Sequence, residues 1–494
     1  MSMAAPMAAG DGRRDLLKKL GWTSLSSVTQ MLAGIASVMV LTRFLAPSDY
    51  GLYGIAFIAA AFTEVLTSGA MSSPVEQKPE VSRQELNSIF WANLSLAVLC
   101  SALTFAVSAL IAPAAGWPEA LPVIGAVCLL VTLTAAGIVP ESLLRRRQAF
   151  KTLARAGMWS AVISLAAGLV LAMAGAGVWA LIGLEAIRRL ILVTAAFVLS
   201  KWRPGAGIDI CILRSDLPFI TGMLAAGALG RLDRLAPQVA AAIFFGPAGL
   251  GLLNVATRIA DQIQSFVAQP VGAMALPVLA NVSADRERFH SLMADAWRAI
   301  SIATFPMLAG FAAIAPLLVP MFVGEAFAGV GLISAVTVLA QLRVVSSKVN
   351  IAATQAAGRA LTASASIASS LLAHIALLVV LAPLSVLAIA SASLLRGWLT
   401  WPLAALFVKS TTGFNLGRQF AILFPPLAAS LIMGGCVYAI CELLRPQMPA
   451  VAALGLLIAS GLVIYTAALW MLDPWVRKAL AAGTWRRRLK GGQV

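Results

Sequence analysis

The chain is poor in the residues from which most enzyme active sites are built. Its 494 residues include two histidines and four tyrosines, and charged residues of both signs make up only 11%. Two histidines give little material for a zinc site or a catalytic triad, and we expect His374, inside an apolar stretch, to be packed and hydrogen-bonded. No glycine-rich nucleotide motif or nucleophile elbow is recognisable, and the five cysteines lack CxxC spacing, which favours inert buried thiols. We therefore predict no catalytic residue, no metal site and no cofactor.

The residues that are present are mostly apolar. Hydrophobic residues make up 60% of the chain, whereas a soluble domain has roughly 45–50% of them and about 25% charged residues. Long apolar stretches recur from Leu20 to Leu472, and one crossing of a bilayer takes about 20 residues. We predict an all-α, polytopic membrane bundle of about 14 transmembrane helices. The predicted spans are 20–45, 50–72, 88–114, 119–141, 155–176, 177–200, 216–245, 250–281, 299–322, 327–351, 362–382, 384–408, 417–443 and 448–472.

Basic residues outnumber acidic ones, and their positions alternate along the chain. The formal net charge is +16, and Lys and Arg gather before the first span and in every second loop, as at 145–147. The opposite loops, such as 112–119 and 246–249, contain neither. Because positive loops stay in the cytoplasm, we expect both termini there, in a cell inner membrane, with the first span retained as an anchor. The charge then serves topology and contact with membrane lipids, and no nucleic-acid partner is expected.

An internal repeat divides the predicted bundle into two halves. Residues 44–56 align without a gap with residues 244–256, and Phe, Pro, Gly, Leu and Ala recur at matching positions. The copies are separated by an even number of predicted spans, which favours parallel repeats related by an axis along the membrane normal, as in some transporters. Chance identity of small and turn residues is the alternative. The predicted domains are a basic cytoplasmic N-terminus (1–19), two six-helix lobes (20–214 and 215–410), two additional helices (411–473) and a basic cytoplasmic tail (474–494).

Several short motifs of the two halves resemble a known transporter family. The first half has Arg43-Phe44-Leu45-Ala46-Pro47 with Tyr50-Gly51, then Glu76, then Phe90-Trp91; the second has Asp233-Arg234, Gly251, Asn254, Ala256, Arg258 and Pro277-Val278. With these residues the chain resembles the polysaccharide transporters, the O-antigen and exopolysaccharide flippases of a superfamily that also contains lipid II flippases and multidrug exporters. The chain departs from the family at Gly230-Arg231-Leu232, where members often have another acidic or polar residue.

The resemblance implies a fold, a cargo and partners. The implied fold is a V-shaped helical bundle of two parallel six-helix repeats plus two C-terminal helices. The implied activity is transfer of a polyprenyl-diphosphate-linked oligosaccharide from the cytoplasmic to the outer leaflet, by alternating access, for exopolysaccharide or lipopolysaccharide synthesis. The implied partners are this lipid-linked substrate and a polysaccharide polymerase with its export machinery.

Charged residues inside two neighbouring spans form the predicted substrate site. Arg231, Asp233 and Arg234 lie in the seventh span, and Arg258 and Asp261 lie at a similar predicted depth in the eighth. Ionisable residues at mid-membrane cost about 2.5–3.5 kcal/mol each on insertion scales, so they usually face a cavity. Three arginines against two aspartates leave one positive charge, which suits a diphosphate because guanidinium groups match phosphate oxygens. The alternative is a neutral packing network in which Asp233 pairs with Arg234 and Asp261 with Arg258.

Three further basic residues have two readings each. Arg43, at the exterior end of the first span, either contacts substrate or extends its charge to the membrane surface. Arg343 and Lys348 in the tenth span either widen a basic entrance or act only as topology signals.

Transport also needs an energy source. Glu64 is the acidic residue of the second span, and a membrane carboxyl group can carry a proton as a transporter alternates. We predict coupling at Glu64, with Asp261 as the second candidate, and expect Glu185 to pair with Arg188 and Arg189. Proline residues at 270, 277 and 306 either let half-helices hinge or only kink them.

Three alternatives to a flippase stay open. A drug or metabolite exporter of the same superfamily would need buried carboxylates for a cationic cargo, and the arginine excess argues against it. A membrane-embedded glycan polymerase would show long exterior loops, and a non-transporting scaffold would lack a solvated cavity.

Overall fold

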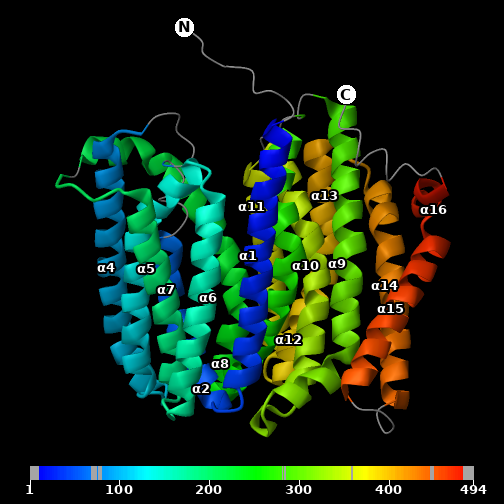
Figure 1. The fold of residues 1–494 in the computed structure, drawn as a ribbon, viewed down its shortest axis with the longest axis horizontal. Helices are drawn as coiled ribbons and strands as arrows, with labels where there is room; N and C mark the ends of the chain where they lie inside the picture. Colours follow the sequence, from blue (N-terminus) through cyan, green and yellow to red (C-terminus); the bar gives the residue numbers. More distant parts are fainter. Residues whose placement is uncertain are drawn as a thin grey trace. The chain divides into compact units, whose positions relative to one another are not determined.

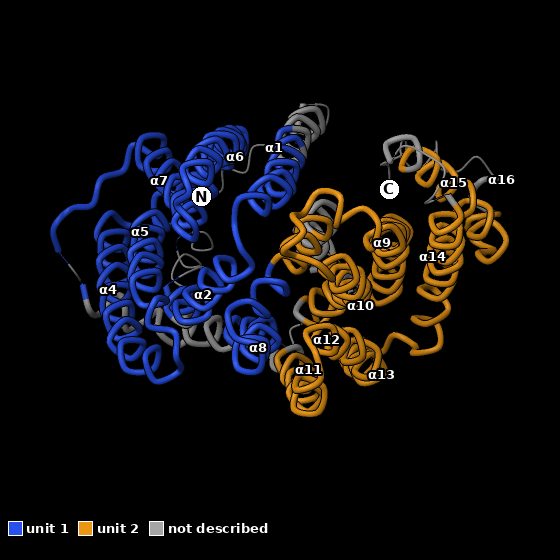
Figure 2. The backbone as a smooth tube through the Cα atoms, turned by 90° about the horizontal axis from the view of Figure 1, so that it is seen from below, with its two compact units in different colours: residues 1–254 blue, residues 255–494 orange. Residues whose placement is uncertain are grey.

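The described part of the chain is helical throughout. The computed structural model describes residues 11–67, 75, 81–207, 209–280, 282, 285–357, 360–444 and 450–481, and these contain no strand. The chain divides into two compact units, Met1–Asn254 and Val255–Val494 (Figure 2). The boundary between these units, at 254/255, lies later in the chain than the predicted boundary between the lobes, at 214/215. The five-part domain organisation stays a prediction. The all-α fold class is confirmed.

The helices of the first unit follow the predicted spans closely (Figure 1). They are α1 (Asp11–Leu41), α2 (Pro47–Thr67), α4 (Arg83–Ala114), α5 (Ala120–Arg146), α6 (Phe150–Met173), α7 (Val178–Ser200) and α8 (Ile210–Ala280), of which α8 continues into the second unit. The backbone of α8 leaves the helical region at Gly246, where φ is 62° and ψ is −163°. This glycine separates the predicted spans 216–245 and 250–281, and a residue with a side chain would be strained at this positive φ.

The helices of the second unit also coincide with predicted spans, apart from a short last helix that lies in the predicted cytoplasmic tail. They are α9 (Arg286–Phe322), α10 (Val330–Ala356), α11 (Ala360–Leu381), α12 (Val386–Leu399), α13 (Trp401–Thr412), α14 (Leu416–Leu444), α15 (Ala450–Leu472) and the short α16 (Pro474–Ala481). The twelfth predicted span is divided, because α12 ends and α13 begins around Thr400. The helices α8 and α9 continue through the prolines at 270, 277 and 306, so hinging at these positions stays a prediction.

Ten helices among the described residues are long and apolar enough to cross a membrane. Three other predicted spans, α1, α2 and α7, fall outside this count, and α8 contributes to it once although it has two halves. The protein is therefore a multi-pass membrane protein, while the number of fourteen crossings stays a prediction.

The helices expose apolar side chains and bury small polar ones. On α4, Leu99 and Leu110 are exposed, whereas Asn93 and Ser101 are buried. The Asn93 side chain donates to the Ala135 carbonyl of α5 at 3.1 Å, and the Ser101 hydroxyl donates to the Cys128 carbonyl at 3.2 Å. This inside-out distribution suits a lipid environment, where polar groups must be satisfied within the bundle.

The two copies of the internal repeat lie against each other in the first unit. A Cβ atom on Gly51 would overlap the carbonyl oxygen of Pro247, and a Cβ atom on Gly251 would overlap the carbonyl oxygen of Pro47. These contacts are reciprocal at an offset of 200 residues, as a local two-fold relation requires. Next to them, the Asn254 side-chain amide donates to the Tyr50 carbonyl at 3.1 Å. The glycines therefore allow α2 and α8 to cross with their backbones in contact.

The Phe90-Trp91 motif fixes the chain segment that precedes α8. Phe90 lies in a buried apolar cluster with Trp202, at a ring distance of 5.4 Å. The Trp91 indole donates to the Gly205 carbonyl at 2.9 Å, and the Gly205 amide donates to the Asn87 side chain at 3.0 Å. This family-like motif is therefore structural. Glu76, the preceding motif residue, lies outside the described residues.

His374 and most of the described cysteines are buried or half-buried. His374 is buried, with its Nε2 atom 3.1 Å from the Ser393 hydroxyl, which confirms the packed reading. Cys128 and Cys441 are buried and Cys100 is half-buried, whereas Cys436 is exposed on α14, so the expectation of burial is wrong for that residue. The Cys211 side chain lies outside the described residues.

Candidate functional site

A buried carboxylate on α7 organises two arginines of the first unit. Glu185 is 6% exposed and lies one turn before Arg188 and Arg189. Arg188 donates to both carboxylate oxygens, at 3.1 and 3.0 Å, and Arg189 Nε donates to one of them at 2.7 Å. This confirms the expected pairing within α7, and its i, i+3 and i+4 spacing places the three side chains on one face.

Arg189 joins three helices. Its guanidinium donates to the Thr134 hydroxyl of α5 at 2.7 Å and lies 5.7 Å from the Phe57 ring of α2. The side chain is 11% exposed, so its charge is held inside the bundle by a carboxylate, a hydroxyl and an aromatic face. Arg189 therefore acts in the packing of α2, α5 and α7 against one another.

Arg188 is different, because its side chain is 42% exposed. It also interacts electrostatically with Tyr53 and Glu64 on α2. Two nitrogen atoms of its guanidinium donate to Glu185 while the side chain as a whole stays partly exposed, which is the arrangement of a positioned anion-binding group.

The predicted coupling residue and a predicted substrate residue form an ion pair. Glu64 of α2 accepts a hydrogen bond from Arg231 of α8, and each side chain is 29% exposed. The Nε atom of Arg231 is buried and has no hydrogen-bond partner among the described residues. The pair is of the kind that the neutral-network alternative describes, but the acid comes from another helix and not from Asp233 or Asp261.

Two carboxylates and three guanidinium groups are thereby connected in the first unit. Glu64, Glu185, Arg188, Arg189 and Arg231 carry one net positive charge, and Arg188 links the α7 group electrostatically to Glu64. Since isolated charges in a membrane are costly, the surplus charge is expected to meet an anion or water. We call these five residues the charged cluster.

The other predicted site residues have varied positions. In the first unit, Arg43 follows α1 and is exposed, Arg234 is exposed on α8, and Asp233 is half-buried. In the second unit, Arg258 is half-buried and Asp261 is exposed, with the Gln341 amide 3.5 Å from the Asp261 carboxylate. The predicted single site with Arg231, Arg234 and Arg258 stays a prediction.

Arg343 is enclosed in the second unit. It is 7% exposed, its guanidinium lies 5.9 Å from the Trp401 ring, and it donates to the Ser347 hydroxyl one turn along α10. These contacts describe a packed side chain on α10.

The sequence analysis assigned Arg188 no role in substrate binding, although its side chain is the most exposed of the three arginines in the charged cluster. The interpretation treated it only as a partner of Glu185, because the three residues adjoin on one helix. The available signal was the imbalance of two arginines against one acid within an apolar span.

The long apolar helices and the charged cluster within the first unit define a polytopic helical membrane protein. The structure has the fold of the lipid II flippase MurJ in its inward closed conformation, with a TM-score of 0.72 over 93% of this chain and 99% of the other, at 15% identity. It also resembles a multidrug resistance MATE family transporter in its inward-facing conformation, with a TM-score of 0.58, covering 79% of this chain and 99% of that one, at 13% identity. At these identities the likeness establishes the fold.

The family follows from the sequence match. A family model described as polysaccharide biosynthesis protein matches residues 40–331, which is more than half of the chain, and the chain belongs to this family. It is 24% identical over 310 residues to the succinoglycan biosynthesis transport protein ExoT of Rhizobium meliloti, covering 63% of each chain. It is 22% identical over 314 residues to the lipopolysaccharide biosynthesis protein WzxC of Escherichia coli, covering 62% of each. The match thus spans less than two thirds of these relatives' length. The resemblance to polysaccharide transporters is confirmed.

Proposed function

We propose that this protein is a flippase that moves a polyprenyl-diphosphate-linked oligosaccharide across the cytoplasmic membrane for polysaccharide biosynthesis. The observation that carries the proposal is the charged cluster, which holds a surplus guanidinium charge inside a bundle of apolar helices. A diphosphate neutralises such a charge with charge-assisted hydrogen bonds. The family and the names of its relatives in succinoglycan and lipopolysaccharide biosynthesis support a glycan cargo.

Within the cluster we assign two residues to the diphosphate. Arg188 is half-exposed and positioned by Glu185, so it can add an anionic ligand without losing its internal partner. Arg231 is occupied by Glu64, and a diphosphate competes with that carboxylate for the guanidinium. Arg234, Asp233, Arg258 and Arg43 remain proposed further contacts along the path.

The competition for Arg231 offers a route to proton coupling. When Glu64 takes up a proton, it loses its charge and releases Arg231, which then binds the diphosphate more strongly. When the proton leaves, Glu64 recaptures Arg231 and weakens substrate binding. Proton uptake and cargo binding at Glu64 and Arg231 would therefore be linked, and Asp261 remains a second coupling candidate.

The remaining parts of the proposal concern location and partners. The protein would lie in the inner membrane with both termini in the cytoplasm, deliver its cargo to a polymerase and export machinery, and catalyse no covalent step. The name of one relative, a succinoglycan biosynthesis transport protein, supports a non-enzymatic role.

A translocation assay in vesicles tests the function. Purified protein in liposomes is given a fluorescent polyprenyl-diphosphate oligosaccharide or a cationic dye, and transfer to the opposite leaflet or to the lumen is measured. We expect transfer of the lipid-linked sugar only, reduced at least tenfold by Arg188→Gln or Arg231→Gln. Transport of the dye alone would show a drug exporter and overturn the proposal.

The assay has an internal control and a pH arm. The control is Arg145→Gln, which also removes an arginine that pairs with a glutamate. That pair is exposed, with side chains 54% and 43% accessible, so the transport activity of this variant should be unchanged. Glu64→Gln mimics the protonated carboxyl and should give slower transport that no longer responds to a pH gradient. A wild-type response to the gradient in this variant would exclude Glu64 as the coupling residue.

A further inference from the structure

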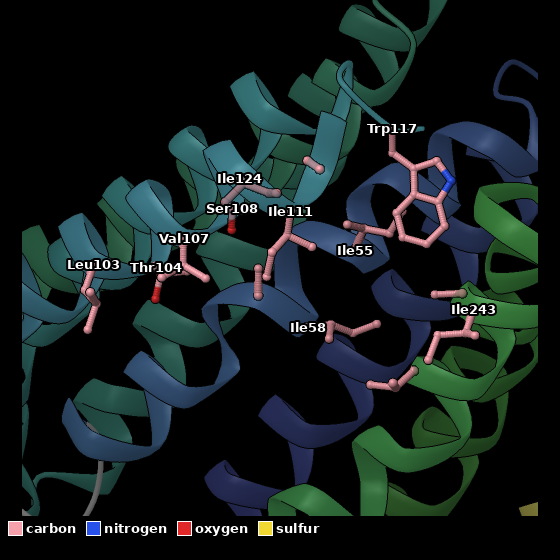
Figure 3. A pocket seen from close by; sticks show the side chains of 14 residues that line it. Ile55, Ile58, Leu103, Thr104, Val107, Ser108, Ile111, Trp117, Ile124 and Ile243 are labelled. Atoms are coloured by element: carbon pink, nitrogen blue, oxygen red, sulfur yellow. The ribbon is translucent and has the colours of Figure 1, made fainter. Parts of the chain in front are cut away.

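An apolar cavity lies in the membrane-spanning part of the first unit, apart from the charged cluster. It has a volume of about 430 Å³ and is lined from α2, α4, α5, α8 and the turn after α4. Figure 3 shows Trp117 beside Ile55 and Ile111, with Ile243 on the α8 side. This volume is within the range of roughly 300–1,000 Å³ that small-molecule sites occupy.

The lining offers hydrocarbon and almost nothing else. Its two hydroxyl residues are Thr104 and Ser108. The Thr104 hydroxyl shares a hydrogen bond of 3.2 Å with Thr63, and Ser108 is 8% exposed. The cavity contains no charged side chain, so a polar or ionic ligand would lose its hydration there without compensation.

The rim of the cavity is continuous with the surface that faces lipid. Leu103 and Ile111 on α4 and Ile243 on α8 are all more than half exposed although they also line the cavity. A ligand can therefore enter sideways from the hydrocarbon core without crossing a polar barrier.

The cavity and the ion pair of the charged cluster lie on the same two helices. Ile58 precedes Glu64 on α2, and Val239 follows Arg231 on α8, by about two turns or roughly 10 Å in each case. A polyprenyl diphosphate joins its anionic group directly to the first isoprene units, so both parts reach their sites together. A phospholipid would need a headgroup anchor beside the cavity, and the adjoining turn at 112–119 has no Lys or Arg.

We infer that this cavity binds the first isoprenoid units of the carrier lipid, while its diphosphate contacts the charged cluster. The inference rests on the proposed function and assigns it a tail site between α2, α4 and α8. The site recognises branched hydrocarbon, and it makes the carrier lipid, as well as its glycan, a determinant of transport.

Photo-crosslinking with the full chain in nanodiscs tests the inference. The probe is a polyprenyl diphosphate with a diazirine on its second isoprene unit, and adducts are mapped by mass spectrometry. We expect adducts between residues 103 and 117 or between 239 and 243, and at least fivefold fewer in Val107→Trp, which fills the cavity. Leu110→Trp is the matched control, because Leu110 lies on the same helix, is 77% exposed and does not line the cavity.

Two outcomes would overturn the inference. Adducts confined to other helices, or equal labelling of Val107→Trp and Leu110→Trp, would exclude a tail site in this cavity. A diazirine phospholipid that labels the same residues as efficiently would show a general lipid contact. If wild-type protein transfers the lipid-linked sugar in either case, the tail site fails while the proposed function stands; if it transfers none, the proposed function fails whatever the labelling shows.

Discussion

At the scale of single residues, charge balance decides which arginines can serve a ligand. Glu185 is nearly inaccessible and accepts hydrogen bonds from two arginines, so it neutralises only one of them. The Nη1 atom of Arg189 donates to the Thr134 hydroxyl and to the Leu130 carbonyl. The Arg188 side chain, in contrast, stays 42% exposed. The difference in exposure between these two adjacent arginines is therefore set by their neighbours on α2 and α5.

Removing the Glu185 charge should destabilise the protein and misplace Arg188. In Glu185→Gln two guanidinium groups lose their counter-charge, and breaking a buried pair in this way costs about 3–5 kcal/mol. We expect a clearly lower thermal midpoint in detergent and transport reduced by at least tenfold. Adding Arg189→Gln restores charge balance and should recover part of the midpoint but not the transport. An unchanged midpoint in Glu185→Gln would contradict the structural role of this carboxylate.

At the scale of helices, the crossing of α2 and α8 depends on two glycines. Gly51 and Gly251 each face the backbone oxygen of a proline from the other repeat copy, and neither site has room for a methyl group. The Asn254 amide secures the same crossing through the Tyr50 carbonyl. The crossing also sets the approach of the helices that bear Glu64 and Arg231.

A methyl group at this crossing should therefore be harmful, although alanine favours helices. In an open helical site, Gly→Ala changes stability by about 0.5–1 kcal/mol in the favourable direction. Gly435 on α14 has no atom near its missing side chain and supplies that control. We expect Gly51→Ala and Gly251→Ala to lower the yield of folded protein by size-exclusion chromatography, and Gly435→Ala to leave it unchanged. Equal yields of all three variants would contradict the close crossing.

At the scale of the whole molecule, positive loops and apolar spans predict how the chain is threaded through the membrane. The turn at 112–119 lacks basic residues, and the end of α5 has Arg145 and Arg146 in its last turn. The turn and these two arginines lie at opposite ends of α5. If α5 crosses the bilayer, as its length and composition allow, they lie on opposite sides of it.

Cysteine labelling checks this threading in intact cells. With the five native cysteines replaced by serine, Ala115→Cys should react with a membrane-impermeant maleimide added outside, and Arg145→Cys should react only after lysis. Both positions are exposed, so accessibility within the protein does not limit either reaction. Labelling of Arg145→Cys in intact cells would reverse the predicted orientation.

Much of the fold could be predicted because each helix carries its own signal. Apolar runs of sufficient length defined the helices, and Pro47 and Pro247 marked the turn inside each repeat copy. The contact of Gly51 with Pro247 was not predicted, because a repeat indicates internal symmetry but no distance between its copies. The division of the twelfth span at Thr400 was not predicted, because both parts are apolar and a local break leaves hydropathy unchanged.

The candidate site was predicted only in part, because partner choice depends on distance in space. The sequence singled out both Glu64 and Arg231 but gave them separate roles, since they are 167 positions apart along the chain. It identified the pairing of Glu185 with Arg188 and Arg189, because residues one turn apart must meet on a helix. The apolar cavity gave no signal, since its lining residues resemble every other lipid-facing residue.

The sequence by itself determined that this protein is a helical, multi-pass membrane protein of the polysaccharide biosynthesis family. Hydrophobicity and charge act locally, so the cost of placing each segment in water or in lipid can be read along the chain. Only the tertiary structure decided that Glu64 holds Arg231, that Arg188 stays accessible and that α2, α4 and α8 enclose a cavity. These features arise from the packing of distant helices, which composition does not specify.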